Sequence, residues 1–201
     1  MDKLVVISDL QIPHEDPQSV WAVLRFVAEF KPDTLVLNGD ILDFGALSKF
    51  RLTLEARARL RRELEMFESV LGAVRRAAPQ ARLVYIDGNH EQRLQDYLVD
   101  RAPELAFLSD AGGPLSLEAL GNFEELGIEH LSPYGNFLDW HGVTITHGSR
   151  ILEHTAKANL IAEGSSGISG HTHRLSSFFK TDRAGAHAWF EGGCLCVTEG
   201  P

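Results

Sequence analysis

Cysteine is scarce in this sequence, with two residues among 201, and a disulfide-stapled scaffold is therefore excluded. Long hydrophobic runs are also missing. The first apolar run, Leu4-Val5-Val6-Ile7, ends after four residues at Ser8-Asp9, which is too short for a signal peptide or a bilayer-spanning helix. We therefore expect an intracellular, cytoplasmic protein with no membrane partner.

Positive charge is the second shortage. Lys and Arg total 19 against 28 Asp and Glu, which gives a formal net charge of -9. A chain with this net charge is poorly suited to bind duplex DNA without sequence preference, because neutralisation of phosphates dominates the affinity of such binding. A small anionic substrate held by a local cationic centre remains compatible with this charge. With 44% hydrophobic and 23% charged residues, the chain has the composition of a folded domain, and its length predicts a single one.

Short apolar runs and helical periodicity alternate along the first half of the chain. Strands are expected at Leu4–Ser8, Thr34–Leu37 and Arg82–Ile86, and helices at Pro17–Phe30, Thr53–Ala78 and Glu91–Val99. The second half is richer in strands, expected at Val143–Thr146, Ile168–Ser169, Phe178–Thr181, Ala186–Phe190 and Leu195–Thr198, with a helix at Ile151–Glu163 and a cap of short helices at Pro103–Gly127. This order favours an α/β sandwich over a purely doubly wound sheet.

The longest expected helix is amphipathic. Its apolar face carries Leu60, Leu64, Phe67, Val70, Leu71 and Val74, and its other face carries Arg57, Arg59, Arg61, Arg62, Glu63 and Glu65. We interpret the charged face as solvated rather than as a nucleic-acid patch.

Polar residues collect where five of the expected strands stop. The segments are Ser8-Asp9-Leu10-Gln11, Asn38-Gly39-Asp40-Ile41-Leu42-Asp43, Asp87-Gly88-Asn89-His90-Glu91, Thr146-His147-Gly148 and Ser169-Gly170-His171-Thr172-His173. A single Asp after a strand is usually a turn or cap residue. Five such ends can converge on one crevice, because sites in open α/β sheets form beyond the carboxyl ends of strands.

The donor set in these segments suits metal ions. His171 and His173 start about 6.6 Å apart in an extended segment, which is wide for one ion but suits two ions about 3.5–4 Å apart. Mixed carboxylate, amide and imidazole donors suit Mn, Fe or Zn.

The motifs Asp9-x-Gln11, Gly39-Asp40-x-x-Asp43, Gly88-Asn89-His90-Glu91, His147-Gly148 and Gly170-His171-x-His173, in this order, resemble those of the calcineurin-like metallophosphoesterase superfamily. Overall, the sequence resembles the small bacterial and phage members of this superfamily. The resemblance implies an α/β fold, a four-layer αββα sandwich, as a single domain over residues 1–201. It also implies two divalent ions, with Mn expected first and Fe, Zn, Ni, Co or Mg as alternatives.

Site roles follow from the resemblance residue by residue. The implied ligands are Asp9, Gln11, Asp40 and His173 for the first ion, and Asp40, Asn89, His147 and His171 for the second. His90 would protonate the leaving oxygen, Asp43 would orient His90, and a hydroxide shared by both ions would attack phosphorus. The family usually has His where this chain has Gln11, and a neutral amide oxygen shifts the expected preference toward Mn.

The implied reaction is hydrolysis of phosphoester bonds. Phosphodiesters are the first choice, as nucleotides or single-stranded nucleic acid, which would make the protein a phosphodiesterase or nuclease. The alternatives are a phosphomonoesterase, including a protein phosphatase, and a metal-binding protein with little turnover. Arg93, Arg150 and Arg174 are candidates for the substrate phosphate, weighed against surface ion pairs. Cys194 and Cys196 are interpreted as packing residues.

Overall fold

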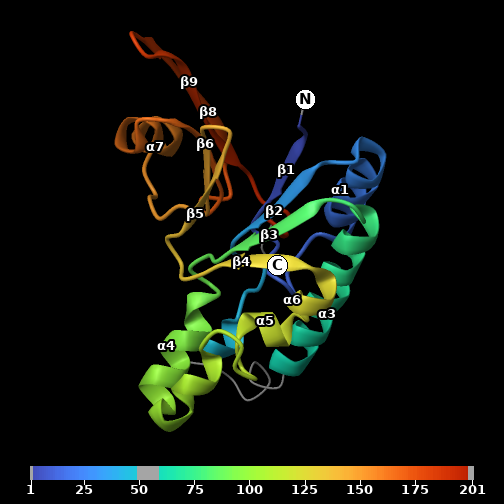
Figure 1. Ribbon diagram of the computed structural model, residues 1–201. Coiled ribbons are helices and arrows are strands. Elements are labelled where there is room, and N and C mark those ends of the chain that lie inside the picture. The colour runs from blue at the N-terminus through green and yellow to red at the C-terminus, as the bar shows by residue number, and fades with distance from the viewer. Residues whose placement is uncertain (1, 49–58, 199–201) are drawn as a thin grey trace.

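Two β-sheets lie face to face in the computed structural model, which describes residues 2–48 and 59–198 (Figure 1). The first sheet has the order β1-β2-β3-β4 and is parallel throughout; its strands are Leu4–Ile7, Thr34–Asn38, Arg82–Ile86 and Ile128–Leu131. The second sheet has the order β5-β6-β7-β9-β8, with strands Phe137–Trp140 (β5), Val143–Thr146 (β6), Ser166–Ser169 (β7), Leu175–Asp182 (β8) and Gly185–Gly192 (β9). Its two outer pairs are antiparallel and its inner pairs are parallel.

Helices connect the strands of both sheets. They are α1 (Pro17–Phe30), η1 (Gly45–Leu47), α3 (Leu60–Ala77), α4 (Gln92–Arg101), η2 (Pro103–Ser109), α5 (Leu117–Leu120), α6 (Phe123–Leu126) and α7 (Thr155–Glu163). The sequence explains the ends of α1. The carboxylate of Asp16 accepts the backbone N–H of Gln18, Pro17 occupies the first turn, and Lys31 ends the helix in the left-handed region just before Pro32. None of the helices in the described ranges is long and apolar enough to cross a bilayer.

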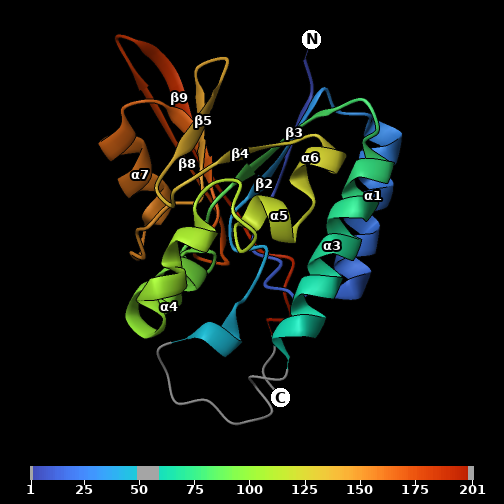
Figure 2. The same ribbon diagram turned by 60° about the horizontal axis from the view of Figure 1, so that its bottom comes forward.

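Successive side chains of the central strands point to opposite faces of the first sheet, and this alternation produces two separate apolar layers. Leu35 and Leu37 of β2 belong to the cluster that α1 and α3 complete, whereas Val36 belongs to the cluster between the sheets, together with Ile145 of β6. Figure 2 shows α1 and α3 side by side on the outside of the first sheet and α7 on the far side of the second. Trp189 of β9 packs against α7 in a third cluster. The molecule therefore has the expected helix-sheet-sheet-helix order.

Several sequence predictions need correction. Leu195–Thr198 is not a strand, because Gly193, at φ 73°, turns the chain away from β9. It runs instead beside residues 9–16. That segment contains left-handed residues and a proline, so it does not pair as a strand and forms only an isolated bridge, between Glu15 and Cys196. Strands β4 and β5 were not predicted, because charged residues and histidine interrupt their short apolar patterns. The expected helix start at residues 53–58 lies outside the described residues.

Glu63 does not lie on a solvated face. It is 1% exposed, and its carboxylate accepts the backbone N–H of Phe44, a residue in the left-handed region. Burial raises the pKa of Glu63 to about 7, although the hydrogen bond from Phe44 acts in the opposite direction. The side chain therefore ties α3 to the loop that carries Asp43.

Replacing this carboxyl with an amide tests the effect of its burial. The folded-state pKa lies above the usual value, so wild-type stability should decline as pH rises from about 4.5 through about 7, by about 1–3 kcal/mol from this group. Glu63→Gln should show a smaller decline, and Glu65→Gln, at an exposed position on the same helix, should behave as wild type. Urea unfolding at pH 5 and pH 8 measures this. Equal pH dependence in all three proteins would contradict it.

Candidate metal centre

Side chains from both sheets meet beyond the carboxyl ends of their strands. Asp9 follows β1, Asp40 follows β2, Asn89 follows β3, and His147 and His171 follow β6 and β7. Asp9 and Asp40 are fully buried, at 0% and 1% exposure. The Nε2 atom of His147 lies 3.2 Å from Oδ2 of Asp40 and 3.3 Å from Oδ1 of Asn89. The strand ends thus converge as the sequence analysis expected.

One half of this cluster has the donors of a metal site. Ligand atoms of Asp40, His147 and His171 all lie within 4.8 Å of one another. The Nδ1–H of His147 donates to the carbonyl of Asn38 at 2.9 Å, so Nε2 is the nitrogen that faces Asp40 and is placed to bind a cation. Among the described residues, Nδ1 of His171 is one of the buried atoms with no hydrogen-bond partner. A cation here would satisfy that nitrogen, so the residues fit a metal ion.

The other half contains Asp9, Gln11 and His173. Nε2 of His173 lies 3.4 Å from Oδ1 of Asp9 and 2.9 Å from Nε2 of Gln11. The amide nitrogen of Gln11 therefore faces the ring of His173, and rotation of that amide would present its oxygen instead.

Asp40 and His147, the buried pair at the centre of the cluster, are held in their charged forms by electrostatic interactions. Burial raises the pKa of Asp40 and lowers that of His147, but their hydrogen bond and mutual attraction outweigh both effects. The pKa of Asp40 ends below its usual value and that of His147 is raised to about 9. A cation bound at Nε2 of His147 would have to displace a proton.

The backbone at these strand ends is strained. Five of the expected ligands have φ between 49° and 70°, in the left-handed region: Asp9, Gln11, Asp40, His171 and His173. Such residues cost about 1–3 kcal/mol each and persist only where the surroundings fix them. Gly39 also leaves no room for a side chain, because a Cβ there would lie 2.5 Å from Nδ1 of His147.

Glu91 fixes two of the strand ends. Its buried carboxylate accepts five hydrogen bonds, from the backbone N–H groups of Asp40, Ile41, Leu42 and Gly88 and from the hydroxyl of Tyr85, at 2.8–3.1 Å. Burial and the neighbouring carboxylates of Asp40 and Asp87 raise the pKa of Glu91, and the hydrogen bonds oppose this. The sequence analysis included Glu91 in a motif but gave it no role. A carboxylate directly after Gly-Asn-His, near a helix start, was the available signal.

His90 sits between two charged groups beside this cluster. Its Nδ1 lies 3.1 Å from Oδ1 of Asp43, and its Nε2 lies 3.0 Å from a guanidinium nitrogen of Arg93 and 3.7 Å from Oδ2 of Asp40. Burial raises the pKa of Asp43, but His90, Arg93 and His14 outweigh it and hold the pKa below its usual value. Asp43 is therefore ionised and positioned to fix the imidazole.

The other two candidate arginines are engaged elsewhere. Arg150 donates to Asn159 and pairs with Glu163 at 3.2 Å, both on α7. Arg174 donates to the carbonyl of Leu152 and to the hydroxyl of Thr155. The structure thus places Arg93 beside His90 but does not bring Arg150 or Arg174 to the cluster, because the two guanidinium groups hold the start and the end of α7.

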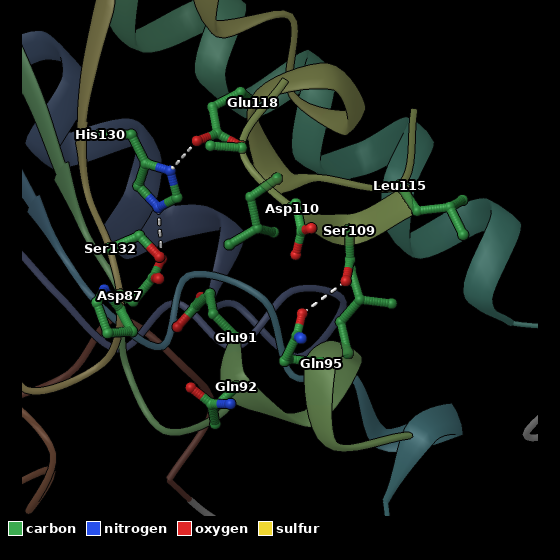
Figure 3. Close-up of a pocket in the computed structure, with 14 residues that line it drawn as sticks. Asp87, Glu91, Gln92, Gln95, Ser109, Asp110, Leu115, Glu118, His130 and Ser132 are labelled. Carbon is green, nitrogen blue, oxygen red and sulfur yellow. Dashed lines mark hydrogen bonds and ion pairs between the residues drawn. The ribbon is translucent and has the colours of Figure 1, made fainter. Parts of the chain in front are cut away.

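A cavity of about 340 Å³, lined by both polar and apolar side chains, borders the loop that carries Asn89 and His90 (Figure 3). His130 lies in its wall, with one ring nitrogen 2.7 Å from Asp87 and the other 2.7 Å from Glu118. Burial lowers the pKa of His130, but the two carboxylates outweigh it and raise the pKa above its usual value. Gln92, Gln95, Ser109 and Ser132 also line the cavity.

Carboxylate, amide and imidazole donors gather at the strand ends of a four-layer sandwich, with Asp9, Asp40 and His147 buried, as expected of a metal-dependent hydrolase. The family model for calcineurin-like phosphoesterases matches residues 3–175, and the chain belongs to this family. The protein is therefore a metal-dependent phosphoesterase that uses divalent ions to hydrolyse a phosphoester substrate, as the motifs predict.

Two phage proteins are among its relatives. The chain is 29% identical over 201 residues to the Gene 54 protein of Mycobacterium phage D29, covering 95% of this chain and 74% of that protein. It is 30% identical over 187 residues to the Gene 54 protein of Mycobacterium phage L5, covering 86% of this chain and 69% of that protein.

Glu91→Gln should destabilise the protein by about 2–4 kcal/mol, because the new amide N–H₂ would face backbone N–H groups that need an acceptor. Metal binding should weaken in the same variant, since Asp40 loses its support. Glu104→Gln, at an exposed position, provides the control. Chemical unfolding with and without Mn²⁺ measures both effects, and an unfolding midpoint equal to that of wild type would refute this role for Glu91.

Proposed function

We propose that this chain is a dinuclear phosphodiesterase that acts on nucleotides or short single-stranded nucleic acid. The observation that carries the proposal is the position of His90, held between Asp43 and Arg93 with Nε2 directed toward Asp40. Because a guanidinium can only donate, Nε2 of His90 accepts from Arg93 here, and the arrangement puts an imidazole and a positive charge beside the candidate metal ligands.

The proposed ligands are those that the motifs imply, and the grouping of Asp40, His147 and His171 supports them. For the first ion we propose Asp9, Gln11, Asp40 and His173, and for the second Asp40, Asn89, His147 and His171. When bound, the two ions lower the pKa of water from about 15.7 toward 7 and neutralise negative charge on the phosphate. Gln11 contributes a neutral oxygen donor where imidazole would be stronger for Zn or Fe, so Mn²⁺ should be the best activator.

His90 supplies the proton for the leaving oxygen, while its neighbours Asp43 and Arg93 orient the ring and bind the substrate phosphate. Asp43 accepts the Nδ1–H of His90, which orients Nε2 toward the leaving oxygen and stabilises the protonated ring. Once Arg93 has turned to the phosphate, Nε2 of His90 is free to carry the proton that it donates to the leaving oxygen as the ester bond breaks. Arg93 is placed to pair with a non-bridging phosphate oxygen, in exchange for its contact with His90.

Two features support a phosphodiester as the substrate: the charge beside His90 and the volume of the neighbouring cavity. Among the residues that the structure describes, one guanidinium, that of Arg93, accompanies His90, and it suits the single negative charge of a phosphodiester. A diester also carries a second organic group, and the cavity of Figure 3 offers it about 340 Å³ beside the same loop. Its carboxylates and amides suit sugar hydroxyls and base amino groups rather than further phosphates.

We also assign the reaction to the cytoplasm. The support is the presence of two free cysteines, Cys194 and Cys196, a pairing state typical of a reducing compartment.

The proposal is tested with metal-stripped protein reloaded with Mn²⁺ and assayed on bis-p-nitrophenyl phosphate and on p-nitrophenyl phosphate. The diester should have the higher kcat/KM. His90→Ala should lower the rate on a diester with an alkyl leaving group by about 10²–10⁴, and by less on the nitrophenyl diester, whose leaving group needs little protonation. His154→Ala, at an exposed position, is the matched control.

Three outcomes would count against the proposal. Preference for the monoester would favour a phosphomonoesterase, and absence of turnover on both esters would favour a metal-binding role. An equal loss for good and poor leaving groups would assign His90 to substrate positioning instead of proton donation.

A further inference from the structure

We propose that Cys194, Cys196 and His173 form a separate site for one thiophilic cation of the Zn²⁺ class, adjacent to the phosphoesterase centre. The ligand atoms of these three residues lie within 4.8 Å of one another. Two thiol groups and an imidazole are a frequent donor set for zinc in proteins. The two cysteines lie outside the motifs of the phosphoesterase, in the part of the chain that the sequence analysis interpreted as packing, whereas His173 belongs to the last of those motifs.

The local backbone explains how the two sulfur atoms come together. Gly193, at φ 73°, ends β9, and the next residues run alongside the segment after β1. Backbone hydrogen bonds from Leu195 to Asp9 and from Asp16 to Leu195 hold this run in place. Cys194 and Cys196, two residues apart, thus stand on either side of a fixed residue.

The separations suit a tetrahedral ion after a small contraction. Sγ of Cys196 lies 3.7 Å from Nδ1 of His173. Bond lengths of about 2.3 Å to sulfur and 2.0–2.1 Å to nitrogen imply about 3.5 Å between these atoms in a tetrahedral site. Cys196 is buried, while Cys194 and His173 are partly exposed, so an ion could enter from solvent and keep water as a fourth ligand.

His173 can serve both sites because its two nitrogens face different ways. Nε2 faces Asp9 and Gln11, at 3.4 and 2.9 Å, whereas Nδ1 faces Cys196. A cation at the thiol site would therefore bind Nδ1 without removing Nε2 from the first position of the phosphoesterase centre. Binding would release the thiol protons to solvent, and the ring proton as well where both nitrogens are used.

Glu15 belongs to the segment that runs beside the two cysteines, because it is the antiparallel bridge partner of Cys196. Its Oε2 is a buried oxygen without a hydrogen-bond partner among the described residues. Glu15 is not one of the three residues whose ligand atoms lie within 4.8 Å of one another, so we do not count it as a ligand.

The two sites should differ in metal preference. Sulfur donors favour Zn²⁺ or Cd²⁺ over Mn²⁺, whereas the carboxylate, amide and imidazole donors of the phosphoesterase centre accept Mn²⁺. A chain loaded with both metals should therefore hold zinc at the cysteines and manganese at the aspartates.

Cobalt titration of the full chain, reduced and metal-stripped, tests the thiol site without any substrate. Two free thiols per chain are first verified by thiol titration. Co²⁺ should then produce a near-ultraviolet thiolate-to-cobalt absorption that saturates at one ion per chain and disappears on addition of Zn²⁺. Because the chain has no other cysteines, this signal can come from no other site.

Variants separate this site from the phosphoesterase centre. Cys194→Ser and Cys196→Ser should each reduce the absorption and weaken Co²⁺ binding at this site more than about tenfold, since loss of a ligand exceeds the 10–100-fold effect of losing an outer partner. Asp40→Asn should weaken Mn²⁺ binding and leave the thiolate signal intact. Cys194 is partly exposed, so Cys194→Ser is the variant expected to fold normally, as circular dichroism would verify.

The proposal is overturned if wild type with two free thiols gives no thiolate absorption at stoichiometric Co²⁺. It is equally overturned if folded Cys194→Ser retains the full signal. Loss of the signal in Asp40→Asn would show that the cysteines bind metal only as part of the phosphoesterase centre, which also contradicts a separate site. Failure of the phosphodiesterase assay would leave the cobalt result unaffected, so the two proposals fail independently.

Discussion

The carboxylate of Glu91 accepts four backbone N–H groups and the Tyr85 hydroxyl in the interior of the protein. These bonds fasten the end of β2 to the end of β3. Asp40 is held there at φ 50°, a conformation that local sequence does not favour, and its carboxylate is directed at His147. A buried carboxylate without these donors would be costly, and the donors without the carboxylate would be unpaired. The loop geometry and the buried charge therefore depend on each other.

A second constraint comes from the packing between the sheets. Val36 and Val84 of the first sheet contact the cluster that contains Ile145 of the second. This apolar layer sets the two sheets so that their carboxyl ends face a common space, where carboxylates from the first sheet meet imidazoles from the second. The charged residues that would be least stable in the interior are thereby gathered where cations can neutralise them.

The sequence predicts the layers and most strands, because residues such as Leu35, Val36 and Leu37 are apolar in an unbroken run that only a doubly covered strand explains. Motif order also predicts which strand ends meet. It does not predict the engagement of Arg150 by α7, the burial of Glu63 or the role of Glu91, since each depends on a partner distant in sequence or on backbone turned into the left-handed region. The cysteines illustrate the same point: the proposed ligand role of Cys194 and Cys196 depends on His173, which the fold brings within reach of both.

Anomalous scattering from crystals grown with Mn²⁺ tests the central claim most directly. Two manganese peaks about 3.5–4 Å apart, on either side of the Asp40 carboxylate, are the predicted result, one near Asp9 and His173 and the other near His147 and His171. A single peak, or peaks that do not share Asp40, would contradict a dinuclear centre bridged by that carboxylate.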